Sequence, residues 1–252
     1  MNQHRTRAFA RAARPWGALL AATLGLFAPG QPAACEGKVD IRVTVKKADF
    51  CDVPPDYLAY VRAIYLAGIT SGCRAASECA YFCPNESVTR EQMAVFLCRA
   101  AGKEPLNRVT PSFVDVSATH WAYGYVERLA DAASWGGNPP TNGCKIIGTA
   151  KYFCPQDPVA REQMAKFLCL AATKSPMPSC TGKFCDVPSS NGFCAFIERL
   201  TDAPSWPGGV AVTSGCACPP GYAGGCKCYC PKDNVTRGQM AVFLVRAFGI
   251  PL

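Results

Sequence analysis

Cysteine is the residue type that offers this chain the most chemistry, because seventeen of its 252 residues are cysteine. Thiolates can bind zinc or act as nucleophiles, and thiols can be oxidised in pairs to disulfides. A reducing cytoplasm tolerates such a density only as metal ligands or catalytic thiols, whereas an exported chain uses it for disulfides. The compartment therefore decides which chemistry applies.

The N-terminal segment indicates export. Four arginines precede a short apolar run and the small residues Ala33-Ala34, a pattern typical of a secretory signal peptide over residues 1–34. Cys35 follows directly, so one alternative is a lipoprotein acylated there, although Pro32 stands where such leaders normally carry leucine. We expect no transmembrane helix in the mature chain and a protein secreted to the cell envelope or cell surface.

Three pairs of cysteines share one spacing pattern. A Gly-Cys dipeptide is followed, ten, ten and fourteen residues later, by the cysteine of a Phe-Cys-Pro or Tyr-Cys-Pro segment. The expected disulfides are Cys73–Cys83, Cys144–Cys154 and Cys216–Cys230. On the chain-entropy account each short loop closed in this way contributes about 3 kcal/mol.

A zinc site is the alternative for one cysteine-rich segment. Zinc binding outside the cell would need reduced thiols in the segments Cys216-x-Cys218 and Cys226-x-Cys228-x-Cys230. In an extended chain, alternating cysteines also point in opposite directions, which suits two disulfides better than one metal ion. We therefore expect no metal and no other cofactor.

Two function classes are disfavoured by charge and motifs. Without the leader arginines the formal net charge of +8 becomes too mildly basic to indicate nucleic-acid binding. After residue 34 the only histidine is His120, and no Gly-x-Ser-x-Gly or His-Glu-x-x-His motif accompanies it. Asp52, Asp115 and Asp186 recur after a phenylalanine, where a turn or cap role explains them. Other carboxylates could serve a glycoside hydrolase, but none has a recognisable setting, so we expect no enzyme.

These residues lie in a sequence that repeats itself three times. The clearest motif is Val88-Thr-Arg-Glu-Gln-Met-Ala, and similar segments start at Val159 and Val235. Glycine-rich and proline-rich insertions in the second and third copies surround Trp135 and Trp206 and are expected to be loops. The predicted organisation is a linker or short strand over 35–49 and repeats over 50–102, 113–173 and 184–252.

Each predicted repeat reads as two helices joined by a loop. Asp56, Thr119 and Ser190 are expected N-caps of the first helices. The second helices open with Thr-x-x-Gln at Thr89 and Thr236, the spacing of a capping box. The second copy has Ala160 at this position, which should cost its helix about 1 kcal/mol.

With these motifs the chain resembles the S-layer homology repeat of bacterial envelope proteins over about residues 50 to 252. The matching segments are Phe113-x-Asp115-Val116, His120-Trp121-Ala122, Gly68-Ile69-x-x-Gly72 and the Thr/Ala-Arg-x-Gln segments. The resemblance implies a mainly α fold, in which three helix-loop-helix repeats form a pseudo-threefold bundle with disulfide-stapled loops. The second helices would pack centrally.

The resemblance also implies a ligand site in the grooves between repeats. The family's Thr-Arg arginine reaches an acidic sugar group, and the matching residues are Arg90, Arg161 and Arg237. Trp121 would be an aromatic platform, although Leu58 and Gly192 replace it in the other copies. Two plainer interpretations stay open: the arginines are solvated surface charges, and Trp121 packs in the core, which we favour. The family's acidic residue is replaced by Gln92, Gln163 and Gln239.

The function that follows is a non-catalytic cell-envelope module that binds cell-wall or surface polysaccharide. The alternative is a structural or protein-binding envelope component, with an envelope protein as its partner and no glycan ligand.

Further disulfides could join the repeats. In a cyclic arrangement Cys51 would pair with Cys169 and Cys98 with Cys185, whereas pairing of Cys51 with Cys98 would close one repeat on itself. Bonds across about 90 to 120 residues would constrain the unfolded chain more than the loop bonds do. The sequence assigns no partner to Cys79, Cys180, Cys194, Cys218, Cys226 or Cys228.

Overall fold

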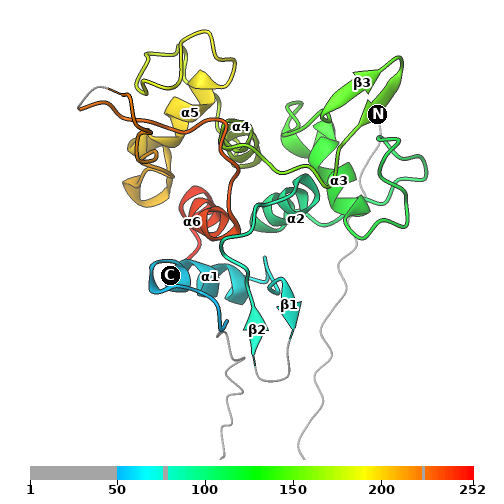
Figure 1. Ribbon diagram of the computed structural model, residues 1–252. Coiled ribbons are helices and arrows are strands. Elements are labelled where there is room, and N and C mark those ends of the chain that lie inside the picture. The colour runs from blue at the N-terminus through cyan, green and yellow to red at the C-terminus, as the bar shows by residue number, and fades with distance from the viewer. Residues whose placement is uncertain (1–49, 76–78, 223–224) are drawn as a thin grey trace, which may run out of the picture. The chain divides into compact units, whose positions relative to one another are not determined.

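The computed structural model describes residues 50–75, 79–222 and 225–252 (Figure 1). The predicted signal peptide over 1–34, Cys35 and the linker or strand over 35–49 lie outside these residues. Within the described part of the chain no helix is long and apolar enough to cross a membrane.

Helices alternate with short strands or loops along the described residues. The α-helices are α1 (Pro55–Leu66), α2 (Arg90–Ala100), α3 (Tyr123–Ala130), α4 (Arg161–Ala171), α5 (Cys194–Leu200) and α6 (Arg237–Phe248). The strands are β1 (Arg74–Ala75), β2 (Ala80–Tyr81), β3 (Lys145–Ile147) and β4 (Ala150–Tyr152). Short 3-10 helices are η1 (Ala132–Trp135), η2 (Ala203–Ser205) and η3 (Pro207–Gly209).

The expected fold class, a mainly α pseudo-threefold bundle, is wrong. In the described residues the six α-helices are accompanied by two antiparallel two-stranded sheets, β1–β2 and β3–β4, which makes the fold a mixed α and β one. The strands form in the loops that join two helices, where Lys145 lies opposite Tyr152 and Arg74 opposite Tyr81. They are too short to leave an alternating pattern in the sequence, so the hairpins were read as loops.

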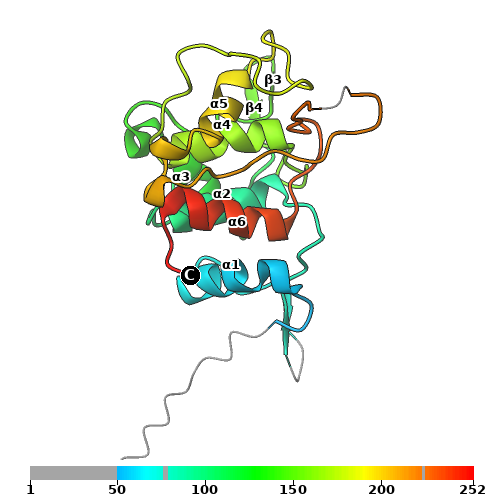
Figure 2. The ribbon, with the colours of Figure 1, turned by 90° about the vertical axis from the view of Figure 1, so that its left-hand side faces the viewer.

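The helices that open with the Thr/Ala-Arg segments pack against one another. Both α2 and α4 contact α6, and α2 contacts α4 (Figure 1). Each of the other helices packs on a helix from a different predicted repeat: α1 on α6, α3 on α2 and α5 on α4 (Figure 2). The core between them contains fully buried Met93, Leu97, Met164, Leu168, Met240 and Leu244.

Capping explains where α2 and α6 begin. The side-chain oxygens of Thr89 and Thr236 each accept a hydrogen bond from the backbone N–H of the glutamine three residues on. The backbone N–H of each threonine in turn donates to the side-chain oxygen of that glutamine. In α4 only the second half exists, because Ala160 has no side-chain oxygen and only its N–H donates to Gln163. Gly249, with φ of 65°, ends α6 in the left-handed conformation that glycine adopts without strain.

The first helices do not begin at the predicted caps. Asp56 lies inside α1, which starts at Pro55, a residue whose fixed φ suits a first helical turn. Tight turns that end at His120 and Asn191 precede α3 and α5, so Thr119 and Ser190 lie ahead of those helices rather than at their N-caps.

Three backbone hydrogen bonds connect three valines in a closed ring. The N–H of Val88 donates to the carbonyl of Val235 at 2.8 Å, that of Val235 to Val159 at 2.9 Å, and that of Val159 to Val88 at 3.0 Å. All three valines are fully buried. We call this set of bonds the valine ring. It joins segments that lie more than 70 residues apart, so no segment can leave without breaking two of the bonds.

The structure joins each of the three cysteine pairs expected from the repeated spacing. Among the described residues the disulfides are Cys51–Cys79, Cys73–Cys83, Cys144–Cys154, Cys180–Cys194, Cys185–Cys226, Cys216–Cys230 and Cys218–Cys228.

The expected pairs Cys51–Cys169 and Cys98–Cys185 are wrong. Cys98 and Cys169 are free thiols, fully buried on α2 and α4, whereas Cys51 and Cys185 are exposed and bond to cysteines of the nearby loops. Burial raises the pKa of both free thiols to about 12. Their thiolates are therefore nearly absent at neutral pH.

Replacement of Ala160 by threonine should complete the capping box of α4. We expect Ala160→Thr to raise the free energy of unfolding by about 1 kcal/mol in urea titrations, because the half-buried first-turn N–H of Gln163 gains the cap oxygen that it lacks in α4. Thr89→Ala is the matched reverse change and should lower it by a similar amount. A destabilising Ala160→Thr would show that the site cannot accept the side chain that positions 89 and 236 carry.

The two buried thiols should be unreactive in the folded protein. At pH 8, below their raised pKa, alkylation by iodoacetamide should be absent at Cys98 and Cys169 until the protein is unfolded without a reductant. Peptide mapping by mass spectrometry then locates the label and, without reduction, the seven disulfides. Label on either cysteine in the native protein would contradict the buried placement.

Candidate functional site

The three arginines of the predicted ligand site are buried. Arg90, Arg161 and Arg237 are the first residues of α2, α4 and α6, and each is only 3 to 4% exposed. The alternative interpretation, in which the arginines are solvated surface charges, is therefore wrong.

Each arginine side chain binds a backbone carbonyl of another predicted repeat. The Nε atom of Arg90 donates to the carbonyl of Phe153 at 2.7 Å, that of Arg161 to Tyr229 at 2.8 Å, and that of Arg237 to Phe82 at 2.7 Å. Each guanidinium also lies over two aromatic rings, 4.8 to 5.8 Å from their centroids. These charge-assisted bonds connect the predicted repeats at all three junctions.

Desolvation acts on two of these buried guanidinium groups. Burial lowers the pKa of Arg90 and of Arg237, while nearby carboxylates, Asp157 and Asp115 for Arg90, oppose that change. Arginine is not deprotonated in proteins near neutral pH, so the opposing carboxylates lie beside charged groups.

The first-turn N–H groups of the same helices also find partners across the junctions. The backbone N–H of Arg90 donates to the carbonyl of Asp157, and that of Glu91 to Pro155, at 2.9 and 3.0 Å. The same two bonds recur at the start of α4 and of α6. Helix N-terminal donors that have no partner within the helix are thus satisfied by a neighbouring loop.

Of the three arginines, Arg90 also lines a small pocket, of about 280 Å³. Thr141 and Asn142 come from the loop ahead of β3, and Gln163 and Lys166 from α4. An Nη atom of Arg90 donates to the hydroxyl of Thr141 at 3.4 Å. We call this the Arg90 pocket.

Trp121 is 61% exposed, so the packing that we favoured is wrong. Its indole lies 6.1 Å from the ring of His120, centroid to centroid. It lines neither the Arg90 pocket nor the larger groove described below, so the structure does not bring it together with the arginines. Leu58 is half-buried and Gly192 exposed at the equivalent positions.

The glutamates that follow Arg90 and Arg161 were missed by the sequence reasoning. Glu91 is 6% exposed, lies 3.2 Å from Nε2 of His120 and accepts a hydrogen bond from Gln156. Glu162 likewise binds Asn191 and Lys232. The third copy has a glycine here because a Cβ on Gly238 would meet the ring of Tyr57 at 2.9 Å.

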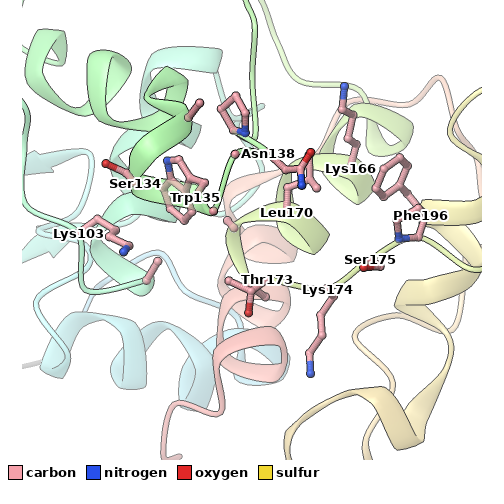
Figure 3. A pocket seen from close by; sticks show the side chains of 18 of the residues that line it. Lys103, Ser134, Trp135, Asn138, Lys166, Leu170, Thr173, Lys174, Ser175 and Phe196 are labelled. Carbon is pink, nitrogen blue, oxygen red and sulfur yellow. The ribbon is translucent and has the colours of Figure 1, made fainter.

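A larger groove, of about 1170 Å³, opens where α2 and α4 end. In Figure 3, Lys103 and Trp135 lie on one side, Phe196 of α5 on the other, and Leu170 of α4 between them. Lys166 and Asn142 also line this groove, which therefore lies next to the Arg90 pocket. The sequence reasoning placed the segment around Trp135 in a loop and predicted no site there. A tryptophan in a loop is the feature of the sequence that could have pointed to this groove.

Hydrogen bonds fix the wall of the groove that carries Trp135. Its indole N–H donates to the carbonyl of Arg128 at 2.7 Å, and Ser134 receives a bond from the Arg128 guanidinium at the same distance. The backbone N–H and the hydroxyl of Ser134 donate to Asp131. The hydroxyl bond is the main reason that the pKa of Asp131 lies below its usual value.

Potential metal-ligand clusters in the described residues consist mostly of disulfide sulfurs. The four groups are Cys218/Cys226/Cys228, Asp52/Cys73/Cys83, Cys180/Cys194/Glu198 and Asp186/Cys216/Cys230. A sulfur in a disulfide is not the thiolate that zinc requires. Asp52 and Asp186 instead accept two backbone N–H bonds each, and Glu198 accepts bonds from Thr181 and Lys183.

Comparison with known proteins identifies one family. Residues 112–165 match the family model of the S-layer homology domain. This segment runs from the start of the second predicted repeat into α4, and it includes Trp121, the loop with Thr141 and Asn142, and Arg161. No curated protein matches the chain significantly.

Loss of a buried arginine should destabilise the protein. Because its carbonyl partner would stay buried without a donor, we expect Arg161→Ala to lower the free energy of unfolding by about 2 to 3 kcal/mol in urea titrations. Lys151→Ala, at an exposed position of β4, is the control and should change it by less than about 0.5 kcal/mol. Equal effects of the two changes would mean that Arg161 does not connect the segments.

Proposed function

We propose that the protein is a non-catalytic module of the cell envelope that binds cell-wall or surface polysaccharide in grooves between its predicted repeats. The observation that carries this proposal is the S-layer homology match over residues 112–165. Domains of this family are anchoring modules of the cell envelope. The matched segment supplies Thr141, Asn142 and Gln163, three of the polar residues of the Arg90 pocket.

The chemistry of the Arg90 pocket suits a sugar. Hydroxyl, amide and ammonium groups of Thr141, Asn142, Gln163 and Lys166 can exchange hydrogen bonds with sugar hydroxyls. Oε1 of Gln163 is engaged by the N–H of Ala160, which leaves its amide N–H groups as donors. A volume of about 280 Å³ lies just below the range of typical ligand pockets, about 300 to 1,000 Å³, so one sugar unit is the natural occupant.

The acids around the two grooves argue against hydrolysis of the glycan. Of the described residues that line the Arg90 pocket and the larger groove, Asp157 is the one carboxylic acid. Glycoside hydrolases normally use two carboxyl groups about 5 to 9.5 Å apart. A single carboxylic acid among the lining residues fits a binding role better than a catalytic one.

The location of the protein follows from its family and its cysteines. Seven disulfides among the described residues fit an extracytoplasmic protein. In this proposal residues 1–34 direct export, and the mature chain stays at the cell surface through its polysaccharide ligand.

A protein-binding role is the second candidate, and exposed apolar side chains favour it. Four apolar side chains in the segment that matches the S-layer homology model are between 57 and 64% exposed. They are Val114, Trp121, Ile146 and Ile147. Such side chains are typical of protein contacts when they gather on one surface.

Co-sedimentation with cell-wall sacculi separates the two candidates. We expect the protein to sediment with intact sacculi and to stay in solution when their secondary polysaccharide has been removed. Asn142→Ala should weaken retention by about fivefold to tenfold, because a hydrogen-bonding group of the pocket is lost. Asn85→Ala, at an exposed position outside both grooves, is the matched control.

Retention that does not depend on the polysaccharide would contradict the proposal. If Trp121→Ala then abolished that retention while Asn142→Ala left it unchanged, the protein-binding role would replace polysaccharide binding.

A further inference from the structure

The β3–β4 hairpin presents apolar side chains that its counterparts in the other predicted repeats do not. Ile146 and Ile147 of β3 are 63 and 57% exposed. The residue equivalent to Ile146 is Ala75 in β1 of the first repeat. In the third repeat it is Cys218, which is held in a disulfide with Cys228. The exposed isoleucines are therefore a feature of the second repeat and not of the repeated fold.

A disulfide closes the same region in the first and third repeats and is replaced in the second. The bonds are Cys51–Cys79 and Cys185–Cys226, and the equivalent residues of the second repeat are Val114 and Ala150. The backbone geometry is nevertheless the same. The N–H of Val114 donates to the carbonyl of Lys151 at 3.0 Å, and the N–H groups of Cys51 and Cys185 make the equivalent bonds at 3.1 and 2.9 Å. An apolar pair, with Val114 64% exposed, thus stands in place of a covalent bond.

One edge of the hairpin is open. Strand β3 pairs with β4 and with no other described strand, and the register places Ile146 opposite Lys151. The carbonyl of Lys151 faces Val114, on the side of β4 away from β3. Residues opposite each other in an antiparallel pair both point inward or both point outward, so Ile146 turns its own N–H and carbonyl away from β4. No described segment outside the sheet donates to or accepts from these two groups.

Protection of the edge explains only part of this arrangement. Short edge strands that carry lysine resist pairing with other chains, and Lys145 fits that role. Two exposed β-branched side chains beside unpaired main-chain groups have the opposite effect, because they favour the addition of another strand. In the third repeat the disulfide of Cys218 covers the equivalent position. The edge of β3 is therefore suited to an added strand.

The charges of the hairpin select the kind of strand. Lys145 and Lys151 are exposed, and neither β3 nor β4 contains an acidic residue. The Nζ atom of Lys145 lies 5.1 Å from the ring centroid of Tyr152, a contact that leaves its N–H donors free. A second copy of this chain paired through the same edge would bring like charges together. A lipid surface would leave the main-chain groups of Ile146 without partners. An acidic strand of another protein meets both requirements.

We infer that the open edge of β3 binds an extended segment of a partner protein as an added strand. The main-chain groups of Ile146 exchange two hydrogen bonds with the segment. An acidic side chain of the segment lies opposite Lys145, and apolar side chains lie opposite Ile146 and Ile147. None of these three residues lines the Arg90 pocket or the larger groove, so the inference does not depend on polysaccharide binding.

Two short peptides test the inference on the purified mature chain. The acidic probe is acetyl-Val-Val-Glu-Val-Val-Glu-amide, and the basic probe has lysine in place of each glutamate. We expect the acidic probe to bind about threefold to tenfold more tightly, because it places an opposite charge rather than a like charge beside Lys145. Added salt should narrow this difference. Binding should shift the NMR signals of residues 145–147 and slow hydrogen exchange at the amide of Ile146.

Variants of the hairpin separate the main-chain bonds from the charge. Ile146→Pro has no N–H to donate and should lose the acidic probe, whereas Ile146→Val should bind it within about twofold of the wild type. Proline is tolerated where the N–H of an edge strand faces solvent, and thermal melts check that the variant is folded. Lys145→Glu should reverse the preference in favour of the basic probe. Lys151→Glu is the matched control, because β4 does not meet the peptide, and it should still prefer the acidic probe.

An acidic probe methylated on every backbone nitrogen gives the main-chain test from the side of the peptide, and it should not bind. Equal binding of the acidic and basic probes, binding of the methylated probe, or NMR shifts confined to other regions would overturn the inference. Binding to phosphatidylglycerol vesicles without binding of either probe would replace the partner strand by a membrane contact. Dimerisation that Ile146→Pro abolishes, again without probe binding, would replace it by a second copy of the chain.

Sedimentation with sacculi keeps this inference separate from the proposed function. Ile146→Pro should be retained by the polysaccharide as strongly as the wild type, because the hairpin edge lies outside the Arg90 pocket and the larger groove. Loss of retention in Ile146→Pro, in a variant that thermal melts show to be folded, would contradict two independent sites. If the wild type itself is not retained but binds the acidic probe at β3, the proposed function fails and the strand site stands.

Discussion

The valine ring is the constraint on which the rest of this structure depends. Val88, Val159 and Val235 each donate to one partner and accept from another, so the three bonds form a closed set. Directly after each valine comes a cap residue and then a buried arginine, which binds a carbonyl of the next segment. Closure places α2, α4 and α6 against one another and makes each outer helix pack on a helix from another predicted repeat.

The grooves are a consequence of this closure. Because α3 packs on α2 and α5 packs on α4, a space remains between these outer helices over the exposed side of α4. Its lining comes from five separate stretches of chain, namely residues 100–103, 132–142 and 166–176 together with Phe196 and Phe248. A binding surface of this kind exists only while the segments are held together, so stability at the centre and binding at the periphery are linked.

Local features of this chain could be read from its sequence, and long-range ones could not. The capping boxes at Thr89 and Thr236 and the loop pair Cys73–Cys83 depend on neighbours within a few residues, so spacing was sufficient. The burial of Arg161 depends on a carbonyl 68 residues away, and repetition alone does not show which copy supplies it. The partner of Cys51 was missed for the same reason. In the candidate site, Arg90 was found, but the larger groove was not, because its lining residues are scattered along the chain and belong to no motif.

Hydrogen exchange at the three valine amides tests the central claim most directly. If the valine ring holds the segments together, the N–H groups of Val88, Val159 and Val235 should exchange only through global unfolding, with one shared free energy equal to that from denaturant titration. Arg161→Ala should then lower all three values equally. Exchange of one valine amide at a clearly lower free energy than the other two would show that its segment opens alone, and would contradict this account.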